Sequence, residues 1–443
     1  MARSRQIGEF PPLESVDAIR AQPWSAQVAK RVESSLASAV AGSPHTVASM
    51  LEEADRPHWC RRADGVDLDI RPRRARSSPT VCCATSYRKA MIDEVVMPES
   101  VGGPGWRLFE EYAAVRNAVE AHTLGTALMS PGAAELLSEY QSNPHRMRRH
   151  FIARDGAEVL GRGMVVWRPH TPETGAYLMV DVLPGSRGKG LGTALAEVVE
   201  QVAVEVGAPV LKAALPHAAS PGAERLAPPT GFGDVSANDP GVRFLHARGF
   251  ALEQVTRISL LEVAGLTQRL DLLEASAAAT AGADYRLISW TGPTPETWVD
   301  DLAELRSRMS TDAPSGGMVM VADPWGAARV REHDERMAGS GRQVITAAAE
   351  HTPSGRLAGY SEIVVSDERP VAVQEDTLVL REHRGHRLGM LLKLAAAERL
   401  RQARPSVEAI VTWNAEENRP MLDVNEAMGF RALGQEGAWQ RRV

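Results

Sequence analysis

The segment Val182–Gly192, VLPGSRGKGLG, joins a predicted strand to a predicted helix. Pro184 and Gly185 end the strand expected over Ala176–Leu183, and the residues after Gly192 carry an apolar stripe at helical spacing. A glycine-rich turn lets main-chain N–H groups approach a ligand, and the start of a helix favours an anion. The segment therefore predicts a cradle for a diphosphate.

The same pattern occurs a second time. His383–Gly389, HRGHRLG, follows a strand expected over Val371–Leu380 and opens another helix with apolar spacing. Downstream of each loop, at Gly249 and at Gly429, a Gly-Phe pair precedes the last predicted strand of the copy. A repeat of this length predicts two copies of one folding unit.

Changes in composition along the chain predict how it divides into domains. Residues 1–86, rich in Ser, Arg, Ala and Pro, are expected to be a disordered or weakly folded extension. We expect the first copy at 87–264, an Ala-rich linker at 265–283 and the second copy at 284–443. Residues 215–237 are rich in Ala, Pro and Gly, and they predict a surface-loop insertion in the first copy.

Overall composition narrows the class of protein. The 443 residues are 44% hydrophobic and 24% charged, with a net charge of −6. This charge argues against nucleic acid as a partner and mildly favours a cationic substrate. No stretch of about 20 apolar residues predicts a membrane span, and the first residues do not read as a signal peptide. Three cysteines without a Cys-x-x-Cys pair predict a reduced, cytoplasmic protein without structural zinc.

Both loops, together with the two Gly-Phe pairs, resemble the GCN5-related N-acetyltransferase (GNAT) family. The resemblance covers roughly residues 90–443. It implies an α/β (α+β) architecture of two tandem GNAT folds, each a mixed, mostly antiparallel sheet flanked by helices. Tandem pairs in an Ala- and Arg-rich chain are most similar to actinobacterial members such as mycothiol synthase. The implied acyl donor is acetyl-CoA, and no metal is implied.

The resemblance also implies which residues contact the cofactor. They are Val182, Arg187, Gly188, Lys189, Gly190, Leu191, Gly192 and Asn238 in the first copy, and Val379, Arg384, Gly385, His386, Arg387, Leu388, Gly389 and Asn418 in the second. Arg387 stands where the first copy has the middle glycine. It adds a phosphate contact if the position allows a right-handed helix start, and it weakens the second site otherwise. We therefore expect the first copy to be the better cofactor site.

The family's catalytic tyrosine is missing from both copies. Its position, four residues before the Gly of Gly-Phe, holds Leu245 in the first copy and Asn425 in the second. That tyrosine is thought to protonate the departing thiolate. Loss of a positioned acid costs about 10²–10⁴ in rate, but a thiolate is a tolerable leaving group. Activity is thus put in doubt and not excluded.

A general base and an oxyanion donor complete the expected site. The base candidates are Asp181 in the first copy and Glu362, Glu375 or Asp376 in the second. Strand alternation predicts that Glu375 and Asp376 lie on opposite faces, so that at most one lines a given cleft. A strand N–H near Val182, or near Val379 in the second copy, is expected to stabilise the oxyanion.

These features predict an acetyl-CoA-dependent N-acetyltransferase. The expected substrate is the primary amine of a small molecule, with no nucleic-acid or membrane partner, and the expected state is a monomer or homodimer. The missing tyrosines leave open a ligand-binding sensor or scaffold in which one or both copies are inactive. A protein acetyltransferase acting on lysine or N-terminal amines is the third possibility.

Overall fold

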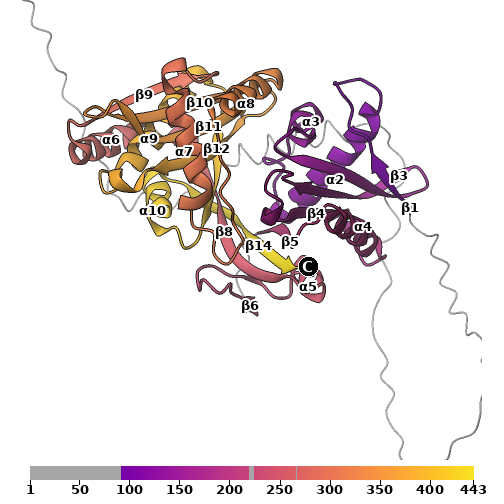
Figure 1. The fold of residues 1–443 in the computed structure, drawn as a ribbon. Helices are drawn as coiled ribbons and strands as arrows, with labels where there is room; N and C mark the ends of the chain where they lie inside the picture. The colour runs from indigo at the N-terminus through magenta and orange to yellow at the C-terminus, as the bar shows by residue number, and fades with distance from the viewer. Residues whose placement is uncertain (1–90, 219–223, 266) are drawn as a thin grey trace, which may run out of the picture. The chain divides into compact units, whose positions relative to one another are not determined.

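Two repeats with the same order of strands and helices build the part of the chain that this computed structural model describes, residues 91–218, 224–265 and 267–443 (Figure 1). The first repeat contains β1 (Met91–Val95), α2 (Trp106–Leu124), α3 (Ala133–Tyr140), β2 (Met147–Asp155), β3 (Glu158–Trp167), β4 (Ala176–Val182), α4 (Leu191–Glu205), β5 (Val210–Ala218), α5 (Pro240–Ala247) and β8 (Ala251–Glu262). The second contains α6 (Thr267–Ala281), β9 (Tyr285–Thr291), α7 (Val299–Asp312), α8 (Ala327–Gly339), β10 (Arg342–His351), β11 (Arg356–Ser366), β12 (Val371–Val379), α9 (Leu388–Ala403), β13 (Ala409–Ala415), α10 (Arg419–Met428) and β14 (Arg431–Arg442).

All of these strands belong to one sheet. Its order is β1-β2-β3-β4-β5-β14-β8-β13-β12-β11-β10-β9. Only the pairs β4–β5 and β12–β13 are parallel, and every other neighbouring pair is antiparallel. The prediction of mixed, mostly antiparallel sheets flanked by helices is confirmed.

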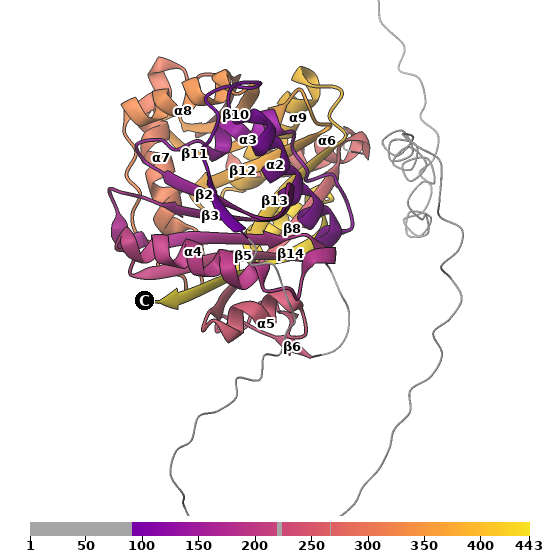
Figure 2. The same cartoon turned by 90° about the vertical axis from the view of Figure 1, so that its right-hand side faces the viewer.

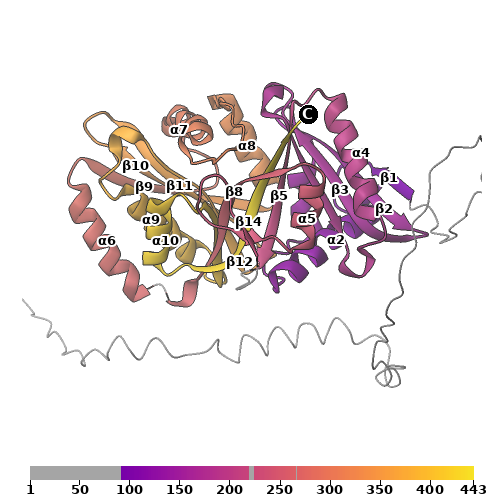
Figure 3. The same ribbon diagram turned by 90° about the horizontal axis from the view of Figure 1, so that it is seen from below.

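The last strand of each repeat lies in the other repeat's half of the sheet. β14 lies between β5 and β8, and β8 pairs with β13 (Figure 3). The end of β14, drawn in yellow, emerges beside α4 of the first repeat (Figure 2), where Arg441 forms an ion pair with Glu200 at 2.8 Å. Neither repeat completes its sheet with its own strands alone, so a boundary between residues 264 and 284 does not separate two independent sheets.

Helices cover both faces of the sheet. In the first repeat, Leu195 and Val199 of α4 are buried against one face, and Tyr112 of α2 is buried against the other. In the second repeat, Leu392 of α9 and Leu302 of α7 take the equivalent places. An opening between two strands can therefore be approached from an α4 side and from an α2 side.

Three predictions about the connecting segments meet different outcomes. The expected linker at 265–283 contains helix α6, whose Ala277 and Ala281 are buried with α9, because an alanine-rich segment is a strong helix former. Within the predicted insertion, Arg225–Leu226 (β6) pairs with Val235–Ser236 (β7), and 219–223 lie outside the described residues. The predicted extension 1–86 also lies outside them.

None of the described helices combines the length and the apolarity needed to cross a membrane.

Candidate active site

The parallel strands of the first repeat separate into a gap. β4 and β5 are paired only at Ala176 with Leu211 and at Tyr177 with Lys212. Beyond Tyr177 the rest of β4 has no ladder partner on the β5 side. The two parallel strands therefore leave an opening beside the glycine loop.

Main-chain groups of β4 point into this gap. The N–H of Leu183 donates to the carbonyl of Leu160 on β3 at 2.9 Å. Because successive residues of a strand point their N–H and C=O groups to opposite sides, those of Val182 and Val180 face the gap. The carbonyl of Val182 accepts a hydrogen bond from Nε of Arg187 at 3.2 Å, whereas its N–H stays available. The N–H of Val182 thus faces the gap, and its donation to an oxyanion stays a prediction.

The glycine loop stands open at the start of α4. Gly188 and Gly190 have φ of 75° and 82°, a left-handed conformation that glycine adopts without strain, and a Cβ at either would meet nothing within 4 Å. Gly190 is the N-cap residue, and Leu191 begins the helix. Lys189 and Arg187 are exposed in the same loop. Free N–H groups, the helix start and two cations together suit a diphosphate.

Gly192 lies on the inner side of the first turn of α4. A Cβ at Gly192 would lie 3.7 Å from Cγ2 of Val182 and 3.8 Å from Cε2 of Phe244 on α5. The loop is therefore packed between the end of β4 and α5, which fixes the direction in which its N–H groups point.

A second gap opens in the second repeat. β12 and β13 pair in parallel from Val371 with Ala409 to Gln374 with Thr412, and then separate. The N–H of Leu380 donates to the carbonyl of Ala358 at 3.0 Å, so the main-chain groups of Val379 face this gap. Nε of Arg384 donates to the carbonyl of Val379 at 3.0 Å, as Arg187 does to Val182.

The second loop differs at its helix start. Arg387 is the N-cap residue of α9 with φ of 53°, and it is the one non-glycine residue with positive φ in the described part of the chain. The right-handed start that would have suited a phosphate contact is absent, because the loop keeps the turn that Gly190 makes in the first repeat. Nη1 of Arg387 also donates to Oγ of Ser276 on α6 at 3.1 Å. Leu388 and Gly389 follow in the first turn, with Leu388 buried and a Cβ at Gly389 lying 3.9 Å from Cε of Met421.

Histidines surround the second loop. His383 Nδ1 lies 3.0 Å from the hydroxyl of Tyr285, and the ring of His386 lies 5.2 Å from the ring of Tyr285. Burial and the neighbouring His351 lower the pKa of His383. No three His, Cys, Asp or Glu side chains within the described ranges form a group suited to a metal ion.

The two asparagines expected at the cofactor lie at the starts of α5 and α10. Asn238 is exposed, and the neighbouring Asp239 caps α5 by accepting from the N–H of Gly241 at 2.7 Å. Asn418 precedes α10, and its carbonyl accepts from the N–H of Met421 at 3.0 Å. Neither Asn side chain is fixed by a hydrogen bond among the described residues, so both can turn toward a ligand.

At the positions of the missing tyrosines, the two repeats differ. Leu245 packs against the core beneath α4. Asn425 is buried, and its Nδ2 donates to Oδ1 of Asn414 at 2.6 Å. Neither side chain can supply an acidic proton, which matches the expectation from the sequence.

Asp181, the base predicted for the first repeat, is held by an arginine. Nε and Nη2 of Arg162 each lie 2.7 Å from Oδ2 of Asp181. Nη1 of Arg162 donates to the hydroxyls of Tyr112 and Tyr140, at 3.3 Å and 3.2 Å. The Asp181 carboxylate thus forms an ion pair with a buried guanidinium, which also binds the two tyrosine hydroxyls.

The predicted alternation of Glu375 and Asp376 does not hold. The register between β11 and β12 shifts after Ser361, with Thr377 opposite Ser361 and Gln374 opposite Ile363. Glu375 and Asp376 lie within this bulge, where two successive residues oppose one, so regular alternation is lost. Crowding by protein atoms and the neighbouring Asp376 raise the pKa of Glu375 to about 7, although its side chain keeps contact with solvent. Asp376 accepts a hydrogen bond from the hydroxyl of Tyr360 at 3.1 Å.

Glu362, the remaining base candidate, is used in packing. Its carboxylate accepts from Nη2 of Arg306 at 2.9 Å and from the hydroxyl of Thr346 at 3.2 Å. It is 5% exposed. A buried, paired carboxylate of this kind holds α7 against the sheet.

One more carboxylate lies in the first repeat's half of the sheet, and the sequence motifs could not reveal it. Glu436 comes from β14 and pairs in register with Pro216 of β5. Trp439 of β14 lies in the core beneath α4, so alternation puts Glu436 on the α2 side of the sheet. Burial, with a further contribution from the nearby Glu120, raises the pKa of Glu436 to about 7. Glu436 forms no hydrogen bond or ion pair within the described residues.

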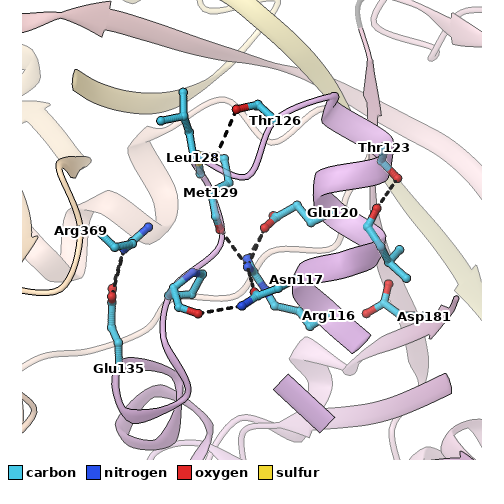
Figure 4. Close-up of polar contacts among 12 residues, drawn as sticks. Arg116, Asn117, Glu120, Thr123, Thr126, Leu128, Met129, Glu135, Asp181 and Arg369 are labelled. Carbon is cyan, nitrogen blue, oxygen red and sulfur yellow. Dashed lines mark hydrogen bonds and ion pairs between the residues drawn. The ribbon is translucent and has the colours of Figure 1, made fainter. Parts of the chain in front are cut away.

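Glu120 of α2 completes an acidic group on this side of the sheet. Figure 4 shows Glu120 beside Arg116, which it meets at 2.6 Å, and shows Asp181 close to the same helix. Burial raises the pKa of Glu120, the pairing with Arg116 opposes the rise, and Asp181 adds to it. Asp181 and Glu120 are thus neutralised by arginines, whereas Glu436 is not.

Comparison with known proteins agrees with this geometry. Residues 127–232 match the model of the acetyltransferase (GNAT) family. No curated protein matches the sequence. A tandem GNAT protein from the clavulanic acid biosynthesis pathway, solved without acetyl-CoA, has a similar structure, with a TM-score of 0.61 and 24% identity over 80% of this chain and 98% of that one.

Two further structures share the fold. One is a GCN5-related N-acetyltransferase from Sphaerobacter thermophilus, with a TM-score of 0.51 and 14% identity over 80% of this chain and 96% of that one. The other is the GCN5-related glucosamine N-acetyltransferase region of a fungal multi-domain β-N-acetylglucosaminidase, with a TM-score of 0.52 and 14% identity over 82% of this chain and 40% of that one. Residues 127–232 thus match the acetyltransferase (GNAT) family model, and the described chain has the fold of these tandem GNAT structures. The likeness to mycothiol synthase stays a prediction.

Proposed function

We propose that the protein transfers an acetyl group from acetyl-CoA to the primary amine of a small molecule, and that the first repeat holds the working site. The observation that carries the proposal is the open gap of the first repeat, with its free glycine loop on the α4 side and carboxylates on the α2 side. Acetyl-CoA supplies an acetyl group as a thioester, which amines attack readily.

The residues of the first loop fit the diphosphate of this donor. The N–H groups that open α4 bind an anion, and Arg187 and Lys189 add positive charge. The N–H of Val182 faces the gap and can donate to the thioester oxygen. In the second repeat Arg387 carries backbone strain and turns toward α6, so we assign that repeat a weaker cofactor site.

Glu436 is our candidate for the general base. A base that takes the proton of an ammonium group works best with a pKa near the working pH, and Glu436 has a pKa of about 7. The β5 residues that lie beside Glu436 and Ala438 on the same face, Pro216 and Ala214, have short side chains. Asp181 and Glu120 are each paired with an arginine, so Glu436 is the carboxylate of this group that we propose to accept the proton.

The proposal also covers the domain division, the cellular location and the oligomeric state. We propose the repeats at 87–264 and 284–443 as the two GNAT units, with their last strands exchanged. We also propose a cytoplasmic protein that works as a monomer or homodimer without nucleic acid. Release of thiol from acetyl-CoA with a panel of amines tests the activity, and binding without turnover on any amine would instead support a sensor.

Replacing Gly190 by Glu tests the assigned cofactor site. The added carboxylate would face the diphosphate, and we expect the Kd for acetyl-CoA, measured by calorimetry, to rise at least about tenfold. Gly207→Glu is the matched control, because Gly207 ends the same helix with φ of 73° and open space around it. Gly389→Glu should change binding less. Equal affinity of all three variants and the parent would show that the site is assigned wrongly.

A further inference from the structure

A pocket of about 320 Å³ lies on the α2 side of the first repeat. Met164 of β3, with Tyr177 and Met179 of β4, forms part of its wall. Tyr177 stands where β4 and β5 separate, and Met179 is two residues before Asp181 on the same face of the strand. The pocket therefore adjoins the gap on the side opposite to the glycine loop, where an acceptor must enter. Its volume suits a small molecule.

Arginines dominate the charge of this pocket. Arg146, Arg148 and Arg168 line it, and Glu139 is the one acidic residue in the lining. Among them, Arg168 has a carboxylate partner, with its Nη1 at 3.1 Å from Oδ2 of Asp323. Asp323 also pairs with Arg329 at 2.7 Å, so it does not neutralise Arg168 fully.

Within residues 91–218, 224–265 and 267–443, neither Arg146 nor Arg148 forms an ion pair with a carboxylate. Nη1 of Arg148 donates to main-chain carbonyls, at 2.8 Å to that of Gln141 and at 3.3 Å to that of Arg146. The guanidinium of Arg146 has no hydrogen bond or ion pair within the described residues. Burial, followed by the nearby Arg146, lowers the pKa of Arg148 to about 10. Arg146 itself is exposed to solvent and Arg148 is half-buried, so an anion that enters the pocket can reach both guanidinium groups.

An unused hydroxyl belongs to the same pocket. Thr174 is 6% exposed, and its Oγ1 is buried without a hydrogen-bond partner in the described structure. Buried polar atoms of native proteins are nearly always paired, so a group without a partner indicates a missing ligand or water. Trp167 and Tyr177 supply apolar walls on either side. This pattern of apolar walls with a few convergent donors is typical of a site for a small polar molecule.

We propose that this pocket selects an amine that also carries an anionic group, a carboxylate or a phosphate, and that Arg146 and Arg148 bind that group. The inference rests on the proposed function. In the reaction the amine nitrogen forms the amide bond as the carbon–sulfur bond of the thioester breaks. The neutral amine loses one proton to Glu436, the thiolate takes up a proton from water, and Glu436 returns its proton to the hydroxide so formed. The net charge of −6 mildly favours a cationic substrate, whereas the arginines give this pocket a positive local charge.

Matched pairs of amines test the selection. Glycine is compared with glycinamide and phosphoethanolamine with ethanolamine, by thiol release from acetyl-CoA with the full chain. A charge-assisted contact of a guanidinium with an anion supports a preference of about tenfold or more in kcat/KM for the anionic member of a pair. The two pairs also distinguish carboxylate from phosphate. Equal turnover of both members would overturn the pocket assignment and leave the acetyltransferase proposal intact.

Two variants separate recognition from folding. Arg146→Gln breaks no contact in the described structure. It should raise KM for the anionic amine about tenfold and leave kcat for that amine nearly unchanged. Both constants for the uncharged amine should also stay nearly unchanged. Arg107→Gln is the control, because the Arg107 side chain is 92% exposed on α2. Thr174→Val replaces the hydroxyl by a methyl group of similar size, and it should raise KM for the same anionic amine by a smaller factor.

A binding measurement gives an answer that does not depend on turnover. Phosphoethanolamine and glycine should raise the melting temperature of the parent and of Arg107→Gln in a saturable way, and should not do so for Arg146→Gln. If no amine is acetylated but this binding is seen, the proposed function fails and the anion pocket stands. If neither anionic amine binds, the pocket inference is wrong.

Discussion

At the scale of single residues, the proposed site depends on one carboxylate, Glu436. Asp181 and Glu120 are both paired with arginines, whereas the half-buried Glu436 has no counter-ion in the part of the chain that the structure describes. Such a group is unfavourable for folding when it is charged, because burial penalises the ionised form. The same penalty keeps its pKa near neutrality, which a base requires. Stability and activity therefore make opposite demands on this residue.

Replacing Glu436 by Gln separates these two demands. The folded-state pKa of about 7 lies above the usual 4.5, so the stability contributed by its proton is present at low pH and is lost as the pH rises from about 4.5 to 7. We expect Glu436→Gln to melt at a higher temperature than the parent at pH 8 and at the same temperature at pH 4.5. Its kcat/KM at pH 8 should fall by about 10²–10⁴.

The pH profile gives a second measurement of the same residue. In the parent, kcat/KM should fall as the pH drops below about 7, because a protonated Glu436 cannot accept the amine's proton. Glu274→Gln, an exposed carboxylate on α6, is the control and should keep the parent's profile. Unchanged turnover of Glu436→Gln at pH 8 would remove Glu436 from the mechanism.

At the scale of elements, each strand–loop–helix unit could be read from local sequence. The prolines, glycines and apolar spacing around Gly190 predict the strand end and the helix start, and both are found. Local patterns could not reveal the bulge at Glu375, since the register of a strand depends on its neighbour. They could not reveal Glu436 either, because its place in the first repeat follows from pairing between strands far apart in the chain. The anion pocket likewise joins residues from β2, β3 and β4 that share no motif.

The helix start of α9 gives a test of backbone strain. Arg387 has a left-handed conformation, which disfavours every residue with a Cβ. Arg387→Ala and Arg387→Gly both remove the contact with Ser276, so their comparison isolates the backbone. We expect the Gly variant to have a free energy of unfolding about 1 kcal/mol larger than the Ala variant, by chemical denaturation. A more stable Ala variant would show that the left-handed turn is not kept in solution.

At the scale of the whole molecule, the exchanged strands join the two repeats into one structure. Trp439 of β14 is fully buried in the core beneath α4, although it belongs to the last strand of the second repeat. β8 in turn lies between β14 and β13. Because each repeat supplies a strand to the other, we expect the described residues to unfold in one cooperative transition.

Trp439→Ala should lower the free energy of unfolding in that single transition by about 3–5 kcal/mol. It should also weaken acetyl-CoA binding by the first repeat at temperatures near melting. Scanning calorimetry with and without acetyl-CoA measures both effects. Trp290→Ala, on the edge strand β9 at the far end of the sheet, is the control: it should lower the melting temperature in the same single transition and leave acetyl-CoA binding unchanged well below melting. Two separate melting transitions in the parent would contradict the interdependence of the repeats.

The exchange of β14 also sets the order in which the chain can fold during synthesis. The contact of Arg441 with Glu200 spans 241 residues, so the first repeat emerges from the ribosome long before the strand that completes it. Until β14 is made, the free edges of β5 and β8 present unpaired N–H and C=O groups, which invite pairing with other chains. Nascent chains stalled before β14 should therefore need a chaperone, and synthesis of the final strand is the event that releases them.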